Sequence, residues 1–226
     1  GTENVAVGSG ALDANTTADH NTAMGHGALG VNTTGTANTS IGRGSMGSNT
    51  TANNNTAVGK DSLAANTTGT ENVAVGAFAL DDNTTGDRNV ALGFGALGVN
   101  TTGEKNISIG RGSMGSNTTA SDNTAVGENA LHTNTTGVNN VAVGAIALDA
   151  NTTANNNTAL GYGALTDNTT GGSNTGVGQG SGEQITTGSN NLCLGRNAGR
   201  AASPGGAITT GSNRVVLGND DTTDLF

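Results

Sequence analysis

The hydrophobic residues of this chain belong to a short motif that returns at constant intervals. The motif Asn-x-Ala-x-Gly, in which another small residue can replace Ala, first occurs at Asn4 and recurs every 17 residues. Its copies start at Asn4, Asn21, Asn38, Asn55, Asn72, Asn89, Asn106, Asn123, Asn140, Asn157, Asn174 and Asn191. The last copy is expected at Asn213, after a longer step of 22 residues whose extra length falls within 196–212, the segment that holds the only proline, Pro204.

A second signature, Asn-Thr-Thr, keeps the same phase. It starts at Asn15, Asn32, Asn49, Asn66, Asn83, Asn100, Asn117, Asn134, Asn151 and Asn168, and becomes Ile-Thr-Thr at Ile185 and Ile208. Between the two signatures a small residue precedes a large apolar one, as in Ala11-Leu12. The segment 41–51 recurs unchanged at 109–119, four repeats later, which indicates duplication of a four-repeat block.

The repeat predicts a coil of strands. Val5, Ala6 and Val7 alternate with period two, which is typical of a short strand. The Gly that closes each motif suits a corner with positive φ, and the Asn of Asn-Thr-Thr suits a second corner. We therefore expect a strand, a Gly corner, a short second strand through Leu12, an Asn-Thr-Thr corner and a return to the next copy.

The predicted fold class is all-β, a β-solenoid or β-roll with 17-residue coils whose copies stack about 4.8 Å apart. Residues 1–195 would form the repetitive shaft, and residues 196–226 a terminal repeat with a longer loop. Each coil has few large apolar side chains to offset its loss of conformational entropy. We therefore expect Val5 and Val7, together with Leu12, to form one apolar face and the Ala column another, so that one face is the core and the other contacts partner chains.

Composition and charge narrow the possible functions. Hydrophobic residues make up 32% of the chain, aromatics 2%, and Gly accounts for 39 residues, which would indicate disorder if the repeat were absent. The net charge of −9 and the absence of a basic stripe argue against nucleic acid as a partner. No apolar run is long enough for a membrane helix, so membrane insertion is not expected. Cys193, in Leu-Cys-Leu, is interpreted as a buried small hydrophobe. Since Gly1 is not Met, a fragment or processed product is expected.

The repeats resemble two families of fibrous proteins. Asn-Val-Ala-Val-Gly, Asn-Thr-Ala-Val-Gly and Asn-Ile-Ser-Ile-Gly resemble the head repeats of trimeric autotransporter adhesins. The longer unit 157–171 is similar to shaft repeats of phage tail fibres and phage-derived bacterial fibres, and 211–224 is similar to the segment that precedes their self-cleaving chaperone domain. The resemblance implies a parallel homotrimer, packed or intertwined, on a virion tail, a bacterial surface or in the periplasm. Adhesin heads have a shorter repeat, so we assign none of their binding sites to positions of this chain.

The repeat fits several kinds of functional site poorly. No recurring Ser/His/Asp set or carboxylate pair is present, so no enzyme activity and no cofactor are expected. The three His residues occupy different phases of the repeat, which argues against a metal column. Asn-Thr-Thr fits the glycosylation sequon, but a corner ladder explains all ten copies. The two adjacent Thr should face opposite sides and give one Thr column, not the paired array that ice binding favours.

Recognition is expected where the repeat varies. The residue after the corner Gly defines the variable column: Ser9, His26, Arg43, Lys60, Ala77, Phe94, Arg111, Glu128, Ala145, Tyr162, Gln179 and Arg196. Such variety indicates a solvent-facing position, and aromatic rings beside Arg suit saccharide contact. The candidate ligand-contact residues are His26, Arg43, Phe94, Arg111, Tyr162 and Arg196. The expected function is a trimeric fibre that acts as a shaft and attaches to a cell-surface glycan or other receptor. The alternative is an ice-binding or saccharide-binding β-solenoid module.

Overall fold

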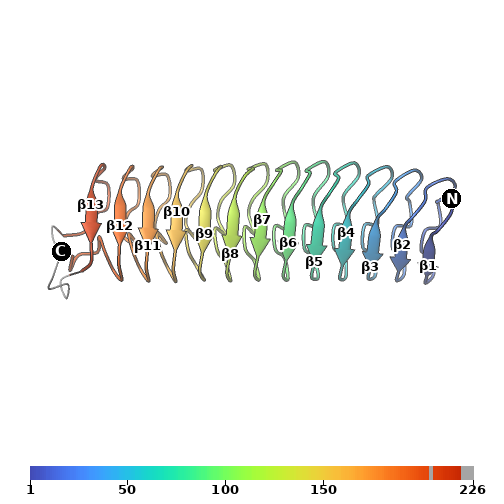
Figure 1. Ribbon diagram of the computed structural model, residues 1–226, viewed down its shortest axis with the longest axis horizontal. Coiled ribbons are helices and arrows are strands. Elements are labelled where there is room, and N and C mark those ends of the chain that lie inside the picture. Colours follow the sequence, from blue (N-terminus) through green and yellow to red (C-terminus); the bar gives the residue numbers. More distant parts are fainter. Residues whose placement is uncertain (204–205, 220–226) are drawn as a thin grey trace. The chain divides into compact units, whose positions relative to one another are not determined.

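The computed structural model describes residues 1–203 and 206–219, and these residues contain strands and turns but no helix. The chain divides into two compact units, Gly1–Thr119 and Ala120–Phe226. The predicted all-β solenoid is confirmed in each unit (Figure 1). The boundary expected at residue 196 remains a prediction.

Every coil contributes one strand of three residues. In the first unit these are β1 (Val5–Val7), β2 (Thr22–Met24), β3 (Thr39–Ile41), β4 (Thr56–Val58), β5 (Val73–Val75), β6 (Val90–Leu92) and β7 (Ile107–Ile109). In the second unit they are β8 (Thr124–Val126), β9 (Val141–Val143), β10 (Thr158–Leu160), β11 (Thr175–Val177), β12 (Leu192–Leu194) and β13 (Val215–Leu217).

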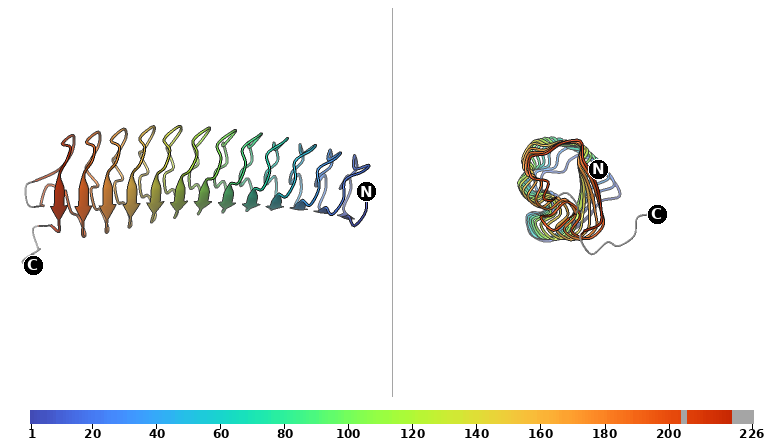
Figure 2. Two further views of the ribbon diagram at one scale, coloured as in Figure 1. Left: turned by 45° about the horizontal axis from the view of Figure 1, so that its top comes forward. Right: turned by 90° about the vertical axis from the view of Figure 1, so that its left-hand side faces the viewer.

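Within each unit every strand pairs in parallel with the strand of the next coil. Thr22 lies opposite Thr39 and Val141 opposite Thr158, so paired residues are one repeat of 17 residues apart. Identical positions of the repeat therefore form columns. Seen end on, the coils within a unit lie over one another (Figure 2, right).

The expected second strand through Leu12 is wrong, because turns occupy this part of the coil. In the second coil, Ala28 N donates to Gly25 O, Gly30 N to Gly27 O, and Asn32 N to Leu29 O. Gly27 and Leu29 both have positive φ, 69° and 49°, which a strand residue does not adopt. Three successive turns thus replace the second strand.

The composition of the core also differs from the expectation. The middle residue of each strand points inward and the two outer residues point outward; in β4, Ala57 is fully buried while Thr56 and Val58 are half-exposed. Leu63, expected on the same face as the outward valines, is instead fully buried on the inside with the Ala column. The reason is the left-handed backbone of the Leu position (φ 52° at Leu63), which follows a turn and reverses the side-chain direction expected for a continuous strand.

The last coil has a different register from the one expected. Leu192 pairs with Val215 and Leu194 with Leu217, so the step is 23 residues and not 22. Arg214 therefore occupies the position of Asn191, and its N–H donates to Asn191 Oδ1 at 3.1 Å. Asn213 lies opposite Asn190, whose Nδ2 donates to it at 2.7 Å. The prediction counted from Asn213, but Asn213 and Gly218 are separated by one residue more than the Asn and Gly of the other copies, and Gly218 keeps the phase.

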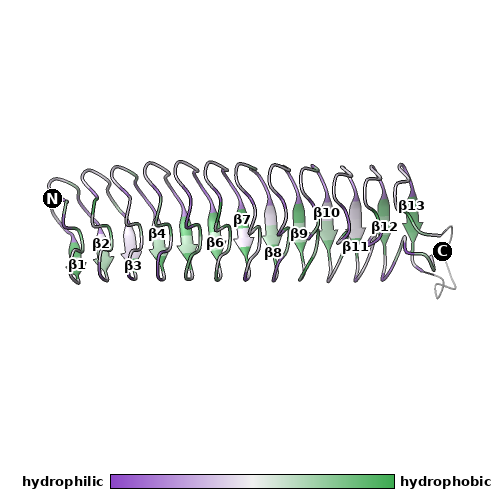
Figure 3. Cartoon of the chain, turned by 180° about the vertical axis from the view of Figure 1, so that it is seen from behind, coloured by the Kyte–Doolittle hydropathy of each residue, from purple (hydrophilic) through white to green (hydrophobic). Residues whose placement is uncertain are grey.

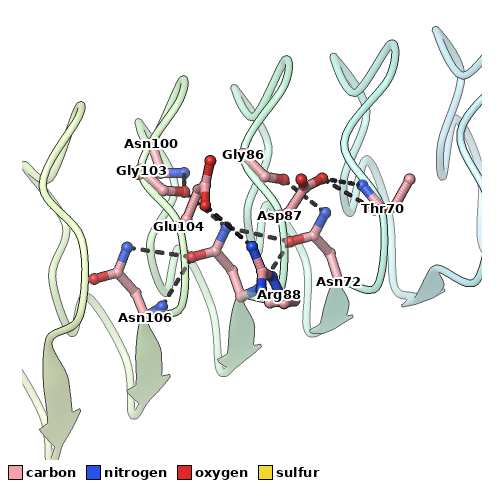
Figure 4. Close-up of polar contacts among 10 residues, drawn as sticks. Thr70, Asn72, Gly86, Asp87, Arg88, Asn100, Gly103, Glu104 and Asn106 are labelled. Carbon is pink, nitrogen blue, oxygen red and sulfur yellow. Dashed lines mark hydrogen bonds and ion pairs between the residues drawn. The ribbon is translucent and has the colours of Figure 1, made fainter.

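Two columns of Asn side chains satisfy the buried backbone of the corners. Asn72 Nδ2 donates to Gly86 O at 2.8 Å, and Asn72 Oδ1 accepts from Asn89 N at 2.9 Å (Figure 4). The second Asn of the same coil, Asn83, also donates to Gly86 O, at 3.0 Å. Both Asn side chains that bond Gly86 are fully buried, so each replaces water as the partner of an otherwise unpaired backbone group.

Candidate functional site

The variable column is solvent-facing, as predicted. Its members are exposed except Ala77 and Ala145, which are half-exposed. The cause lies in the preceding corner glycines, whose φ values lie between 108° and 139°. At Gly76 an added Cβ would lie 2.5 Å from Gly93 O of the next coil, so this corner requires Gly, and the chain then turns outward through the variable residue.

In the first unit, the structure places the candidates His26, Arg43, Phe94 and Arg111 on this exposed column. His26 and Arg43 belong to adjacent coils, as do Phe94 and Arg111. The two pairs are four coils apart, so they do not form one site.

Phe94 belongs to a surface cluster that sequence reasoning missed. Its ring packs edge-on against Phe78, with 5.7 Å between the centroids, and Lys60 Nζ lies 4.6 Å from the Phe78 centroid. Phe78 occupies the position after the variable column, which is Gly in most coils. The available signal in the sequence is an apolar residue, Phe78, at a position that is Gly in most coils.

In the second unit, Tyr162 and Arg196 line two neighbouring pockets. Tyr162, 59% exposed, borders a pocket of about 240 Å³. Arg196 borders a pocket of about 290 Å³. Asn197 and Arg200 line both. Tyr162 and Arg196 therefore each border recessed space, in pockets that share two lining residues.

Ion pairs connect neighbouring coils in both units. Glu183 Oε2 and Arg200 Nη1 are 3.0 Å apart in the second unit, and Arg88 and Glu104 are 3.3 Å apart in the first (Figure 4). The pKa of Asp81 is raised to about 6, chiefly by burial and then by the charges of Asp82 and Asp61. Within the described residues no three His, Cys, Asp or Glu side chains are grouped to hold a metal ion.

Burial and hydrogen bonding account for two other sequence features. The Asn of Asn-Thr-Thr is fully buried from Asn32 to Asn168 and donates within the corner, so it offers no accessible amide for a glycan in the folded chain. Cys193 is buried as predicted, and burial raises its pKa to about 11, which leaves it a poor nucleophile.

The two Thr of each corner differ in their surroundings. The first uses its hydroxyl inside the coil stack, as Thr84 Oγ1 does when it donates to Thr101 O at 3.0 Å. The second, such as Thr85, is exposed. The second Thr is exposed in every corner, whereas the first is half-exposed in most corners and exposed at Thr16, Thr33 and Thr209.

A large apolar surface faces outward along the strands. We define the outer apolar column as the third residue of each strand: Val7, Met24, Ile41, Val58, Val75, Leu92, Ile109, Val126, Val143, Leu160, Val177, Leu194 and Leu217. This position is apolar in all 13 described strands, although each member is exposed or half-exposed in the single chain. In Figure 3, β9, β12 and β13 are green, whereas β3, β8 and β11, which begin with Thr, are paler.

The long loop and the C-terminal segment singled out in the sequence lie only partly within the described residues. The loop after β12 extends around Arg196–Ser203, and Pro204 and Gly205 lie outside the described residues. Of the segment 211–224 that resembles the approach to a chaperone domain, residues 220–224 also lie outside. Among the residues that the structure describes, none forms a helix long and apolar enough to cross a membrane.

The sequence matches no protein-family model, and neither a curated protein nor a solved structure is significantly similar to it.

Proposed function

We propose that this chain is a subunit of a homotrimeric surface fibre, which acts as a shaft and attaches to a cell through glycans bound on its variable column. The observation that carries the proposal is the outer apolar column. Apolar residues scattered singly over a protein surface are common and need no explanation. An apolar position maintained in every described strand, in contrast, marks an interaction surface.

A second copy of the chain is the occupant that fits this surface best. The members of the column recur at one per coil, so a second chain with the same coil spacing matches them one to one. In β5 and β6, Val75 and Leu92 project from the sheet beside Val73 and Val90, which are half-exposed as well. Burying these side chains between chains would stabilise the assembly by about 25 cal/mol per Å² of apolar surface.

The order of the assembly comes from the resemblance of the repeats to adhesin heads and tail-fibre shafts, which motivates a parallel trimer. The same resemblance motivates a location on a virion tail or a bacterial surface. Glycan attachment is supported by the exposed rings and cations of the variable column, including Phe94, Arg111 and Tyr162.

Sedimentation velocity on matched double variants tests the assembly. Val75→Glu with Leu92→Glu places two charges on the outer apolar column, whereas Thr85→Glu with Thr102→Glu adds the same charges to the exposed Thr column of the same two coils. We expect the unmodified chain and the Thr variant to sediment as trimers and the Val/Leu variant as a monomer. A folded, monomeric unmodified chain would contradict the proposal.

A glycan array with the unmodified chain tests attachment. We expect binding that falls at least tenfold on substitution of Tyr162 by Ala. Binding that this substitution leaves unchanged would remove Tyr162 of the variable column from the proposal, and no binding to any glycan would leave the chain a passive shaft.

A further inference from the structure

The pocket beside Tyr162 is formed by four successive residues of one column. This is the position after the variable column, occupied by Ile146, Gly163, Gly180 and Asn197. The two central glycines have no side chains, and Ile146 and Asn197 close the ends. A Cβ at Gly180 would lie 2.7 Å from Asn197 Oδ1 and 3.0 Å from Glu183 Oε2, so any side chain there would enter the pocket.

The two flanks of the pocket differ in chemistry. At one end the exposed ring of Tyr162 and the side chain of Ile146 provide an apolar surface. Toward the other end lie Gln179, Glu183 and Arg200. Arg200 Nη1 is 3.0 Å from Glu183 Oε2 and donates to Asn197 Oδ1 at 3.2 Å, so the donors and acceptors are already held in place.

We propose that this pocket binds one neutral sugar ring, with the apolar face of the sugar against Tyr162 and its hydroxyls bonded to Gln179, Glu183 and Arg200. This inference rests on the glycan attachment proposed above and names its site and ligand class. A sugar ring has an apolar face and a hydroxyl rim, which match an aromatic ring facing amide, carboxylate and guanidinium groups.

Charge and size restrict the ligand further. The guanidinium of Arg200 is paired with the carboxylate of Glu183, so the pocket offers no unpaired cation to an acidic sugar or a phosphate. Its volume of about 240 Å³ is below the roughly 300–1,000 Å³ of sites that enclose drug-sized ligands. A single ring of a longer glycan fits this space, with the remainder in solvent.

The four-repeat duplication supplies an internal comparison. Phe78, Phe94, Gly95 and Gly112 stand 68 residues before Ile146, Tyr162, Gly163 and Gly180, so the glycine pair and the ring recur in the first unit. The polar flank does not recur, because Arg111 and Gly115 stand at the positions of Gln179 and Glu183. In the first unit, moreover, Phe94 packs against Phe78. The proposed specificity therefore belongs to the second unit.

Filling the pocket with Asn gives a sharp test. Gly180→Asn suits the positive φ of 60°, since Asn129 and Asn197 occupy the same position of other coils at 52° and 59°. Gly95→Asn, at the equivalent kind of position in the first unit where an added Cβ meets nothing within 4 Å, is the matched control. Circular dichroism of both variants checks that the fold is kept.

The assay is a glycan array followed by calorimetric titration of the full chain with glucose, galactose and N-acetylglucosamine. We expect neutral glycans to bind, Gly180→Asn and Tyr162→Ala to weaken this binding at least tenfold, and Gly95→Asn to change it less than threefold.

Three results would contradict the proposal that this pocket binds a neutral sugar. Neutral binding that Gly180→Asn leaves unchanged would place glycan attachment elsewhere, and the proposed function would stand without this site. Binding restricted to acidic glycans would contradict the predicted neutrality. Failure to bind any glycan would remove both the pocket and the attachment role, while the trimer, judged separately by sedimentation, would be unaffected.

Discussion

At the scale of single residues, the Leu position of most coils combines full burial with an unfavourable backbone conformation. Leu97 and its equivalents are fully buried, yet their φ values lie near 50°, where a side chain is disfavoured by about 1–2 kcal/mol. A fully buried Leu contributes roughly 1.5–3 kcal/mol through burial, which exceeds this strain. In the coils of β11 and β12, Gly182 and Gly199 occupy the position and remove the strain together with the side chain.

A half-buried carboxyl in the first unit makes stability depend on pH. Because burial and neighbouring carboxylates raise the pKa of Asp81 from 3.8 to about 6, the folded state binds its proton more tightly than the unfolded state. The corresponding stability is fully present below pH 4 and is lost as the pH rises through about 6.

We predict that Asp81→Asn stabilises the chain by about 1 kcal/mol at pH 7.5, a value reduced for partial hydration of the carboxylate, and gives almost no gain at pH 4. Urea unfolding at the two pH values measures the change. The exposed Asp167→Asn, which removes the same charge from the second unit, is expected to change stability little at either pH. Equal gains for Asp81→Asn at pH 4 and pH 7.5 would contradict the pKa assignment.

At the scale of the structural element, the coil is specified by the corner and its turns. The strand has only three residues, so its pairing alone cannot determine where the chain bends. The corner Gly does so, because its φ and its approach to the next coil both exclude a side chain. The Asn columns then provide partners for the corner carbonyls.

Two glycines in neighbouring coils differ in how strongly they exclude a side chain, both through φ (133° at Gly76, 60° at Gly95) and through close approach. Gly76→Ala places a Cβ 2.5 Å from Gly93 O, whereas Gly95→Ala meets no atom within 4 Å, although both positions have positive φ. We predict a loss of about 1 kcal/mol for Gly95→Ala from backbone preference and a loss at least twice as large for Gly76→Ala. Denaturant midpoints measure both, and similar losses would show that the close approach is not a constraint.

At the scale of the whole molecule, the repeat allows its length to change in whole coils. Each coil pairs with its immediate neighbours, so stability is close to a sum over coils and interfaces. The relevant unit is the 17-residue step, which keeps every strand, corner and Asn in its column.

Deletion of residues 73–89 removes one full repeat and joins Asn72 to Val90, which preserves the motif. We predict that this variant folds with cooperative unfolding and a strand content per residue unchanged from the parent chain. Deletion of residues 73–84 removes fewer residues but shifts the phase, and we expect it to unfold at lower denaturant concentration. Circular dichroism with urea titration compares the two, and equal stability would contradict the fixed register.

Features of this architecture that depend on neighbouring residues in the sequence could be predicted, and features that depend on contacts between coils could not. The repeat length, the strand at Val5–Val7, the corner Gly, the exposed variable column and the burial of Cys193 are all set by short-range pattern, and the sequence predicted them correctly. The direction of Leu63, the turns in place of a second strand and the pairing of Val215 with Leu192 depend on positive φ values and on contacts between coils. Periodicity along the chain does not reveal these.

The candidate site also combines a feature that the sequence determines with one that depends on the tertiary structure. The sequence by itself determined that variable residues such as Tyr162 occupy one solvent-facing column, because a repeating backbone presents equivalent positions to equivalent surroundings. Only the tertiary structure decided which of them adjoin recessed space, since the pocket at Tyr162 arises where Gly163 and Gly180 leave room between coils and where Glu183 and Arg200 come within 3.0 Å. Stacking brings together residues 17 or 34 positions apart, and their side chains, not the repeat, shape the surface there.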